Sequence, residues 1–193
     1  MLSTTDAIVL SLQPHSDKAH ILHAYTRACG RVNYMVYGLG RKHAIGIYTP
    51  LSLIQITADH DSSKPPTVKE SALLSPFSFQ LTPQKRAVAL FLSEVLFHVL
   101  RHPMPDEPMF AFLAQEVMAL HDTEEPQNFH LAFLAGFAEK LGFAIPETFN
   151  YTPAPLTRKE RQDSLRALCA YFEEHVETWQ TPKSLDILTE VFD

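Results

Sequence analysis

The chain has 193 residues, of which 46% are hydrophobic and 20% charged, and its formal net charge is −6. This length suits one domain or two small ones, and the apolar content excludes a largely disordered chain. No apolar run reaches the roughly 18 residues that span a bilayer, and no secretory signal opens the chain, so we expect a cytoplasmic protein.

The charge is unevenly distributed along the chain. Residues 1–60 contain five Lys and Arg against three acids, a net of +2, whereas residues 61–193 carry a net of −8. An acidic protein is a poor partner for nucleic acid, but this asymmetry predicts two regions with different surfaces.

The first third of the chain favours β-strands. Five short segments are rich in alternating apolar, β-branched and aromatic residues: Asp6–Gln13, Lys18–Thr26, Arg31–Tyr37, Pro50–Ala58 and Thr67–Leu74. No helical pattern intervenes, which favours a small barrel or sandwich over βαβ units. Five strands in about 75 residues match the size of an OB-fold.

From residue 81 the periodicity becomes helical. The expected helices are Gln84–Arg101, Met109–His121, Gln127–Leu141, Thr157–Thr178 and Pro182–Phe192. Thr82 is a candidate N-cap, Pro83 suits a first turn, and Gly142 is a candidate C-cap. On the fourth helix, the residues expected to face inward are Leu165, Leu168, Cys169 and Phe172. The chain is therefore predicted to be α+β, with a barrel domain over residues 1–80 and an all-α domain over residues 81–193.

A glycine-rich basic segment, Tyr37–Tyr48 ("YGLGRKHAIGIY"), joins two of the strands. Its spacing matches neither G-x-x-x-x-G-K-S/T nor G-x-G-x-x-G, the common nucleotide-binding motifs. Strand-like sequence follows it, so we expect no helix N-terminus there that could bind a phosphate. Two readings stay open: a flexible connection, or a loop whose Arg41 and Lys42 contact nucleic-acid phosphates.

No catalytic or metal-binding pattern is recognisable. His20 and His23 would point to opposite faces of a strand, and no acid or cysteine converges on His98 and His102. Cys29 and Cys169 are the only cysteines, too few for a zinc site or a disulfide framework, so we expect two reduced thiols in or near cores. Nucleophile–base sets and paired catalytic carboxylates are also lacking. We therefore expect no enzyme, no metal and no cofactor.

Aromatic residues accompany the basic ones in the strand region. Four tyrosines lie on or beside the expected strands: Tyr25, Tyr34, Tyr37 and Tyr48. A basic groove with aromatic stacking platforms is typical of single-stranded nucleic-acid binding. Some of these tyrosines must be core, and only one of Tyr34 and Met35 can point inward.

The order of motifs in Ala7–Lys42 resembles the N-terminal segment of the bacterial RecO family of recombination mediators and DNA repair proteins. The shared features are Ser16-Asp17-Lys18, Thr26-Arg27, Gly30-Arg31 and Gly38-Leu39-Gly40-Arg41-Lys42. "TPLSLIQI" (Thr49–Ile56) is similar to the next strand of the family, and "LGF" (Leu141–Phe143) and "SLDILTEVF" (Ser184–Phe192) are similar, more weakly, to its helical domain.

The resemblance implies an OB-fold joined to a helical domain, which binds single- and double-stranded DNA and anneals complementary strands. It also implies cooperation with RecR to load RecA onto DNA coated by single-strand-binding protein (SSB), and a pocket in the helical domain for the acidic, Phe-ended SSB tail. The DNA-contacting residues expected here are Lys18, Arg27, Arg31, Tyr37, Arg41 and Lys42.

The sequence departs from the family pattern in two ways. Many relatives carry a four-cysteine zinc module in the second domain, which a chain with two cysteines cannot form. Asn150–Thr157 also joins two helical stretches abruptly, where relatives carry more helix; either this protein lost that segment or the sequence omits it.

Two other functions remain compatible with the residues. One is a protein-interaction scaffold with an OB-type barrel and negligible DNA affinity, which the acidic helical region favours. The other is an RNA-binding OB protein, which differs only in its ligand.

Overall fold

The computed structural model describes residues 1–39, 46–59, 64–74, 81–143, 145–146 and 156–192. The chain forms two compact units that interleave in sequence. One unit comprises Met1–Leu81 and Leu100–Met118, and the other comprises Thr82–Val99 and Ala119–Asp193. The domain boundary expected at residue 80 stays a prediction. In the structure, the segment that begins at Leu100 groups with the strands.

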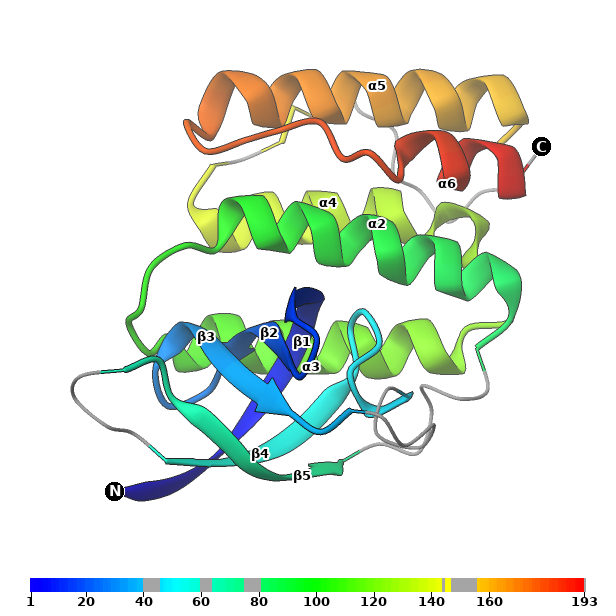
Figure 1. Cartoon of the computed structure of the whole chain (residues 1–193). Helices are drawn as coiled ribbons and strands as arrows, with labels where there is room; N and C mark the ends of the chain where they lie inside the picture. Colours follow the sequence, from blue (N-terminus) through cyan, green and yellow to red (C-terminus); the bar gives the residue numbers. More distant parts are fainter. Residues whose placement is uncertain (40–45, 60–63, 75–80, 144, 147–155, 193) are drawn as a thin grey trace. The chain divides into compact units, whose positions relative to one another are not determined.

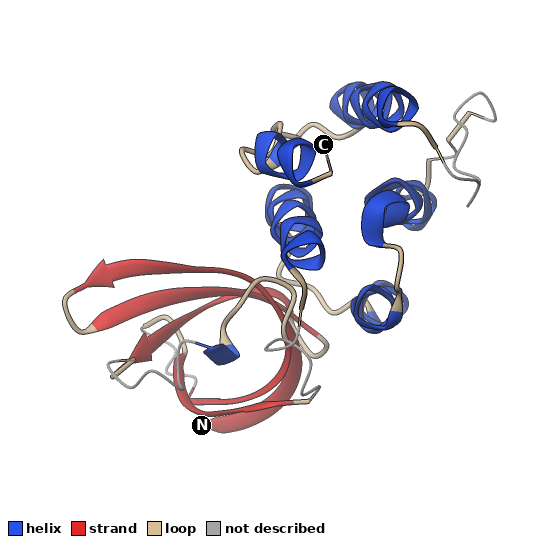
Figure 2. Ribbon diagram, turned by 90° about the vertical axis from the view of Figure 1, so that its right-hand side faces the viewer, coloured by secondary structure: helices blue, strands red, loops and turns tan. Residues whose placement is uncertain are grey.

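The first unit is a closed five-stranded barrel (Figures 1 and 2). Its strands are β1 (Leu2–Ser16), β2 (Ala19–Thr26), β3 (Gly30–Tyr37), β4 (Leu53–Asp59) and β5 (Thr67–Leu73). They close in the order β1-β2-β3-β5-β4; β3 and β5 pair in parallel and the other pairs are antiparallel. A five-stranded barrel followed by helices confirms the expected α+β class and the OB-fold.

Period-two alternation decides which side chains fill the barrel. On β3, Tyr34 and Val36 are buried in the barrel core, whereas Asn33 and Tyr37 are exposed. Tyr34 is 1% exposed, so it, rather than Met35, is the inward residue of that pair.

The segment after residue 99 completes the barrel unit. The backbone N–H of Arg31 donates to the carbonyl oxygen of His102 at 3.0 Å, so this segment pairs with the start of β3. The helix α3 (Glu107–Asp122) follows, and its Phe110 ring stacks on Tyr25 with centroids 6.5 Å apart. Partial burial and the nearby Asp106 raise the pKa of Tyr25 to about 12.

The second unit is helical. Its elements are α2 (Pro83–Val99), η2 (Pro126–Asn128), α4 (Phe129–Leu141), α5 (Arg158–His175) and α6 (Leu185–Val191). Helix α2 packs against α6 and α4, and α4 packs against α5 (Figure 1). In the part of the chain that the structure describes, no helix is both long and apolar enough to cross a membrane.

Local sequence signals set the ends of these helices. Thr82 Oγ1 accepts the N–H of Lys85 at 3.3 Å, and α2 begins at Pro83, as expected. Gly142 ends α4 with a φ of 93°, a left-handed conformation that suits glycine. Thr157 and Glu160 form a reciprocal capping box at the start of α5.

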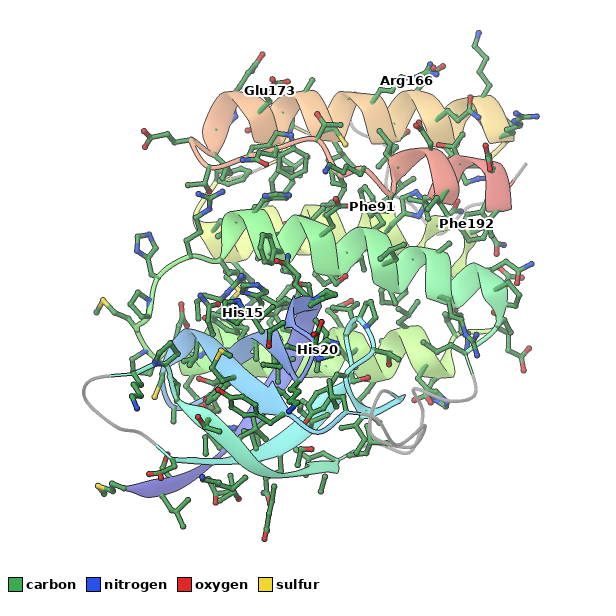
Figure 3. The ribbon with its side chains drawn as sticks, in the orientation of Figure 1. His15, His20, Phe91, Arg166, Glu173 and Phe192 are labelled. Carbon is green, nitrogen blue, oxygen red and sulfur yellow. The ribbon has the colours of Figure 1, made fainter. Side chains whose placement is uncertain are left out.

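Aromatic rings dominate the core of the helical unit. Phe91 on α2, labelled in Figure 3, is fully buried, and its ring meets His130 edge-on at 6.1 Å. Phe172 is also fully buried, and Cys169 is 8% exposed, so the inward face expected for α5 is confirmed. Burial, with a smaller effect from Glu173, raises the pKa of the Cys169 thiol to about 11 and keeps it protonated.

A partly buried pair of hydrogen bonds connects α2 to the residue before α6. Glu94 Oε2 accepts from the hydroxyl of Ser184 at 2.6 Å and from its backbone N–H at 2.9 Å. Partial burial acts to raise the pKa of Glu94, but hydrogen bonds from Ser184 and Lys183 outweigh it, so the pKa lies below its usual value. The ionised carboxylate therefore stabilises this attachment of α6.

We expect Glu94→Gln to lower the free energy of unfolding by on the order of 1 kcal/mol at neutral pH, since solvent screens a partly exposed carboxylate. Unfolded Glu has the higher pKa, so this stability is complete above the unfolded pKa and is lost as the pH falls through the folded pKa. Urea unfolding of both proteins at neutral and at strongly acid pH should show the difference only at neutral pH. Glu173→Gln, at an exposed position of α5, is the control. A difference between Glu94→Gln and wild type that persists at acid pH would contradict this account.

Candidate nucleic-acid interface

The β2–β3 ribbon presents one outer surface of the barrel. Inward residues of the two strands lie in the core, so the alternate residues lie on the outer side. The outer row of β3 contains Arg31, Asn33, Met35 and Tyr37. In OB-folds, the outer surface of strands 2 and 3, with the loops beside it, is the usual binding surface for oligonucleotides.

Lys18 and Tyr37 lie at one end of this ribbon. Tyr37 pairs with Ala19, the residue directly after Lys18, and Lys18 is exposed in the turn between β1 and β2. The Tyr37 ring is 58% exposed. Gly38 follows with a φ of 73°, which fits the turning role expected of it. Arg41 and Lys42, expected on the next loop, lie outside the described residues.

The exposure of Tyr37 distinguishes it from the other tyrosines of the region. Tyr25 is 4% exposed, Tyr34 1% and Tyr48 6%, and the Tyr48 hydroxyl lies 2.8 Å from Ser71 Oγ in a hydrogen bond. Of the four tyrosines considered from the sequence, Tyr37 alone offers a large exposed ring. It is therefore the available stacking platform among them.

Arg27 lies at the opposite end, in the turn between β2 and β3, and already has acidic partners. Its guanidinium forms ion pairs with Asp6 at 3.4 Å and with Glu107, and it lies 4.7 Å above the Phe110 ring. Its backbone N–H donates to the carbonyl oxygen of Asp6 at 2.9 Å. These contacts attach the turn to α3, so the geometry gives Arg27 a structural role, and its DNA contact stays a prediction.

Arg31 begins the outer row of β3 at the same end as Arg27. Its side chain is half-buried, and burial together with the nearby Arg101 lowers the pKa of Arg31 to about 10. The guanidinium therefore stays cationic at neutral pH. Two register positions further along the ribbon, His23 Nδ1 and Asn33 Oδ1 form a hydrogen bond of 2.7 Å.

The structure thus separates the four expected residues that it describes into two groups. Lys18 and Tyr37 are at one end of the β2–β3 ribbon, and Arg27 and Arg31 are at the other. Strands of eight residues at about 3.4 Å per residue place these ends roughly 24 Å apart. The outer surface between them is long enough to follow an extended strand, so the residues do not form a single compact site.

Lys64 and Arg101 are cations of this unit that the residues expected from the sequence do not include. Lys64 is exposed just before β5, where the carbonyl oxygen of Pro66 accepts the N–H of Met35. The sequence pattern predicts that Arg101 ends a helix, but α2 ends at Val99 and the following residues pair with β3. No local sequence signal marks either position, because both depend on the closing of the barrel.

The histidines singled out in the sequence do not come together in pairs that could hold a metal ion. His20 pairs with the inward residue Val36, whereas His23 lies in the outer row, so the two point to opposite sides; Figure 3 labels His20. His102 lies beyond the end of α2, so it does not share a helix with His98. Within the described ranges, no group of three or more His, Cys, Asp or Glu residues could hold a metal ion.

Two family models match the chain in consecutive segments. The model described as "Recombination protein O N terminal" matches residues 1–77, and "Recombination protein O C terminal" matches residues 80–151. Together they cover the barrel strands and the helices as far as α4.

Curated relatives extend the similarity. A protein named DNA repair protein RecO from Phocaeicola vulgatus is 34% identical over 157 residues, which cover 78% of this chain and 65% of the relative. Proteins of the same name from Christiangramia forsetii and Bacteroides fragilis are 27% and 29% identical over 239 and 245 residues, with full coverage of each chain.

The longest of these alignments also bear on the short connection before α5. The Christiangramia forsetii alignment spans 239 positions against the 193 residues of this chain, a difference of 46. The match to the C-terminal model ends at residue 151, within the Asn150–Thr157 segment that the sequence singles out. The fold, the consecutive model matches and the relatives agree, and the chain belongs to the RecO family of DNA repair proteins.

Proposed function

We propose that this protein is a DNA-binding recombination mediator whose barrel holds single-stranded DNA along the outer surface of β2 and β3. The observation that carries the proposal is the exposed Tyr37 ring on the ligand-binding surface of an OB barrel, with Lys18 beside it and Arg31 at the far end. The cations would contact phosphates and the ring would stack on a base. Arg41 and Lys42 stay further phosphate contacts predicted from the sequence alone.

The proposal extends to the partners that the family resemblance implies. The protein would also bind double-stranded DNA, anneal complementary strands, and act with RecR to load RecA. It would do this without catalysis, by holding DNA and proteins together, and it would act in the cytoplasm.

We also propose that the helical unit binds the acidic, Phe-ended tail of SSB. A groove of about 740 Å³ in this unit is lined by Lys85, Arg161 and Phe192, and its lining also includes the acids Asp122 and Glu124. Figure 3 labels Phe192 next to α6. Two cations and an aromatic ring suit a peptide that ends in acidic residues and phenylalanine.

We expect Tyr37→Ala to weaken binding of a fluorescent single-stranded oligonucleotide roughly tenfold, because stacking on an aromatic ring contributes about 1–3 kcal/mol per base. Fluorescence anisotropy at low and moderate salt would measure the affinity. Tyr37→Phe is the matched control: it keeps the ring and should bind like the wild type.

The same titrations separate the proposal from its alternatives. DNA binding should weaken steeply with salt, because each neutralised phosphate releases counterions. Binding that is absent, or that ignores salt, would favour the protein-interaction scaffold and contradict the proposal. A competitor RNA of the same sequence that displaces the DNA at equal concentration would favour the RNA-binding reading.

A further inference from the structure

Residues of α4, α5 and α6 line a small cavity in the helical unit. Its volume is about 20 Å³, and its lining includes His130, Arg161 and Phe192. A single water molecule needs roughly 10–15 Å³, so the cavity has room for a water but not for an aromatic ring. Arg161 and Phe192 also line the groove of about 740 Å³ described above. These two side chains therefore border both the cavity and the groove.

The imidazole of His130 is a buried polar group in the lining of this cavity. His130 is 3% exposed, and its Nδ1 has no hydrogen bond to any residue that the structure describes. Burial, with a smaller effect from the positive charge of Arg161, lowers the pKa of His130 to about 3, so the ring is neutral at physiological pH. A buried nitrogen without a hydrogen bond costs free energy, so the cavity favours a ligand that brings a polar group with it.

Two phenylalanine rings lie against this imidazole. Phe91 meets the His130 ring edge-on at 6.1 Å, and Phe192 stacks on it with centroids 6.3 Å apart and planes 22° apart. Phe91 is fully buried, whereas Phe192 is only half-buried; Figure 3 labels both. The position stacked on His130 is thus shaped for one aromatic ring, and it borders the groove.

Phe192, which fills this position, has few attachments of its own. It follows α6, which ends at Val191, so it lies beyond the regular hydrogen bonds of that helix. The Arg161 guanidinium donates to the Phe192 carbonyl oxygen at 3.3 Å, slightly longer than a usual hydrogen bond. Moving a half-buried ring held in this way costs less than moving a ring of the core.

The sequence around Phe192 has the same order of residue types as the proposed peptide ligand. Glu190 precedes Phe192 by two residues, so an acid comes shortly before a phenylalanine. Arg161, which contacts the Phe192 backbone, supplies a cation at the same place. A segment of this chain therefore occupies a position that suits an acidic peptide with an aromatic residue.

We infer that Phe192 occupies, in the free protein, a subsite for the aromatic side chain of an acidic peptide, and that the ring of a bound peptide replaces it on His130. This inference rests on the proposed peptide groove of the helical unit and adds the subsite and its present occupant. Exchanging one phenyl ring for another preserves the stack on His130. The free energy needed to move Phe192 lowers the apparent affinity of the free protein for the peptide.

The test measures the affinity of a fluorescent oligo-aspartate peptide that ends in phenylalanine. Phe192→Ala should bind this peptide about tenfold more tightly than the wild type, because no ring has to leave the subsite first. The same peptide ending in alanine should bind both proteins equally, since it has no ring to enter the subsite. Fluorescence anisotropy would give all four affinities.

Matched variants separate the lost ring from altered folding. Ile187→Ala removes an exposed side chain of α6 that lines neither the cavity nor the groove, so it should leave the affinity unchanged. Phe192→Leu keeps an apolar side chain but cannot stack, and it should give a smaller gain than Phe192→Ala. Thermal unfolding would check each variant, and Phe192→Leu carries the test if Phe192→Ala does not fold.

The outcomes separate this inference from the proposed function. If the wild type binds the Phe-ended peptide and Phe192→Ala binds it equally or more weakly, the exchange of rings is wrong and the proposed peptide groove stands. If the gain is the same for the peptide ending in alanine, the substitution acts outside an aromatic subsite and the inference is wrong. If neither the wild type nor the Phe192 variants bind the peptide, the proposed groove is wrong and the inference falls with it.

Discussion

Replacing Gly30 with alanine should destabilise the barrel by about 3 kcal/mol or more. The methyl group would lie 2.2 Å from the Met104 carbonyl oxygen and 2.8 Å from the Met104 nitrogen, which are backbone atoms that cannot rotate away. A non-glycine residue at a φ of 64° adds about 1–2 kcal/mol of strain. The displaced segment would also lose the hydrogen bond between Arg31 and His102, at about 1 kcal/mol.

The matched control is Gly38→Ala. Gly38 has a similar φ of 73°, but a Cβ there would meet no atom of the described part of the chain within 4 Å. It should therefore show the backbone strain alone, about 1–2 kcal/mol. Urea unfolding followed by circular dichroism would compare the two variants, and hydrogen exchange of the Arg31 amide would report the loss of the 102–104 contact. Equal losses of stability in the two variants would show that the close approach of residues 102–104 to Gly30 adds nothing to the cost of the substitution.

Replacing Phe172 with alanine should destabilise the helical unit by about 3–5 kcal/mol, the usual cost of removing a fully buried phenylalanine. The ring is inaccessible to solvent and lies among other aromatic rings of the unit. Its centroid distances are 6.1 Å to Phe137, 5.4 Å to Phe143 and 5.0 Å to Trp179. The truncation leaves a cavity that these rings can fill only by leaving their present contacts.

The fluorescence of Trp179 can report the unfolding of this unit, because Trp179 is the only tryptophan and packs directly on Phe172. Its fluorescence during urea unfolding should give a much lower midpoint for Phe172→Ala. Phe172→Leu retains most of the volume and should cost less than about 1.5 kcal/mol. Glu173→Ala, at an exposed neighbour on the same helix, should stay within about 0.5 kcal/mol of the wild type. A Phe172→Ala protein as stable as the Glu173 control would show that this ring is not central to the core.

The strands and helices of this fold follow from local patterns, and their bounds depend on what each element pairs with. The alternation of buried and exposed residues along β3 is predicted correctly, and so is the place of Pro83 in the first turn of α2. Strand β1 is longer than its apolar run because Leu2–Asp6 pairs with β4, a contact that no local pattern marks. Helix α2 ends before Arg101 because the next residues pair with β3.

The candidate site is also predictable only in part, because some of its residues are placed by local alternation and others by contacts between distant parts of the chain. Alternation along β3 separates the exposed Tyr37 from the buried Tyr34, and both belong to one sequence segment. The ion pair of Arg27 with Glu107 joins residues 80 positions apart, so its structural role depends on tertiary packing. Arg101 reaches the barrel through the same kind of contact, and local periodicity can only assign it to a helix.

The grouping of Leu100–Met118 with the barrel has a consequence for synthesis of the protein on the ribosome. Domains generally fold as units while the chain emerges, the N-terminal one first. A nascent chain of 80 residues already contains all five strands, yet it lacks the backbone that pairs with Arg31 and the ring that covers Tyr25. The barrel therefore reaches its final packing only after Met118 has left the exit tunnel, by which time the whole of α2 has been made.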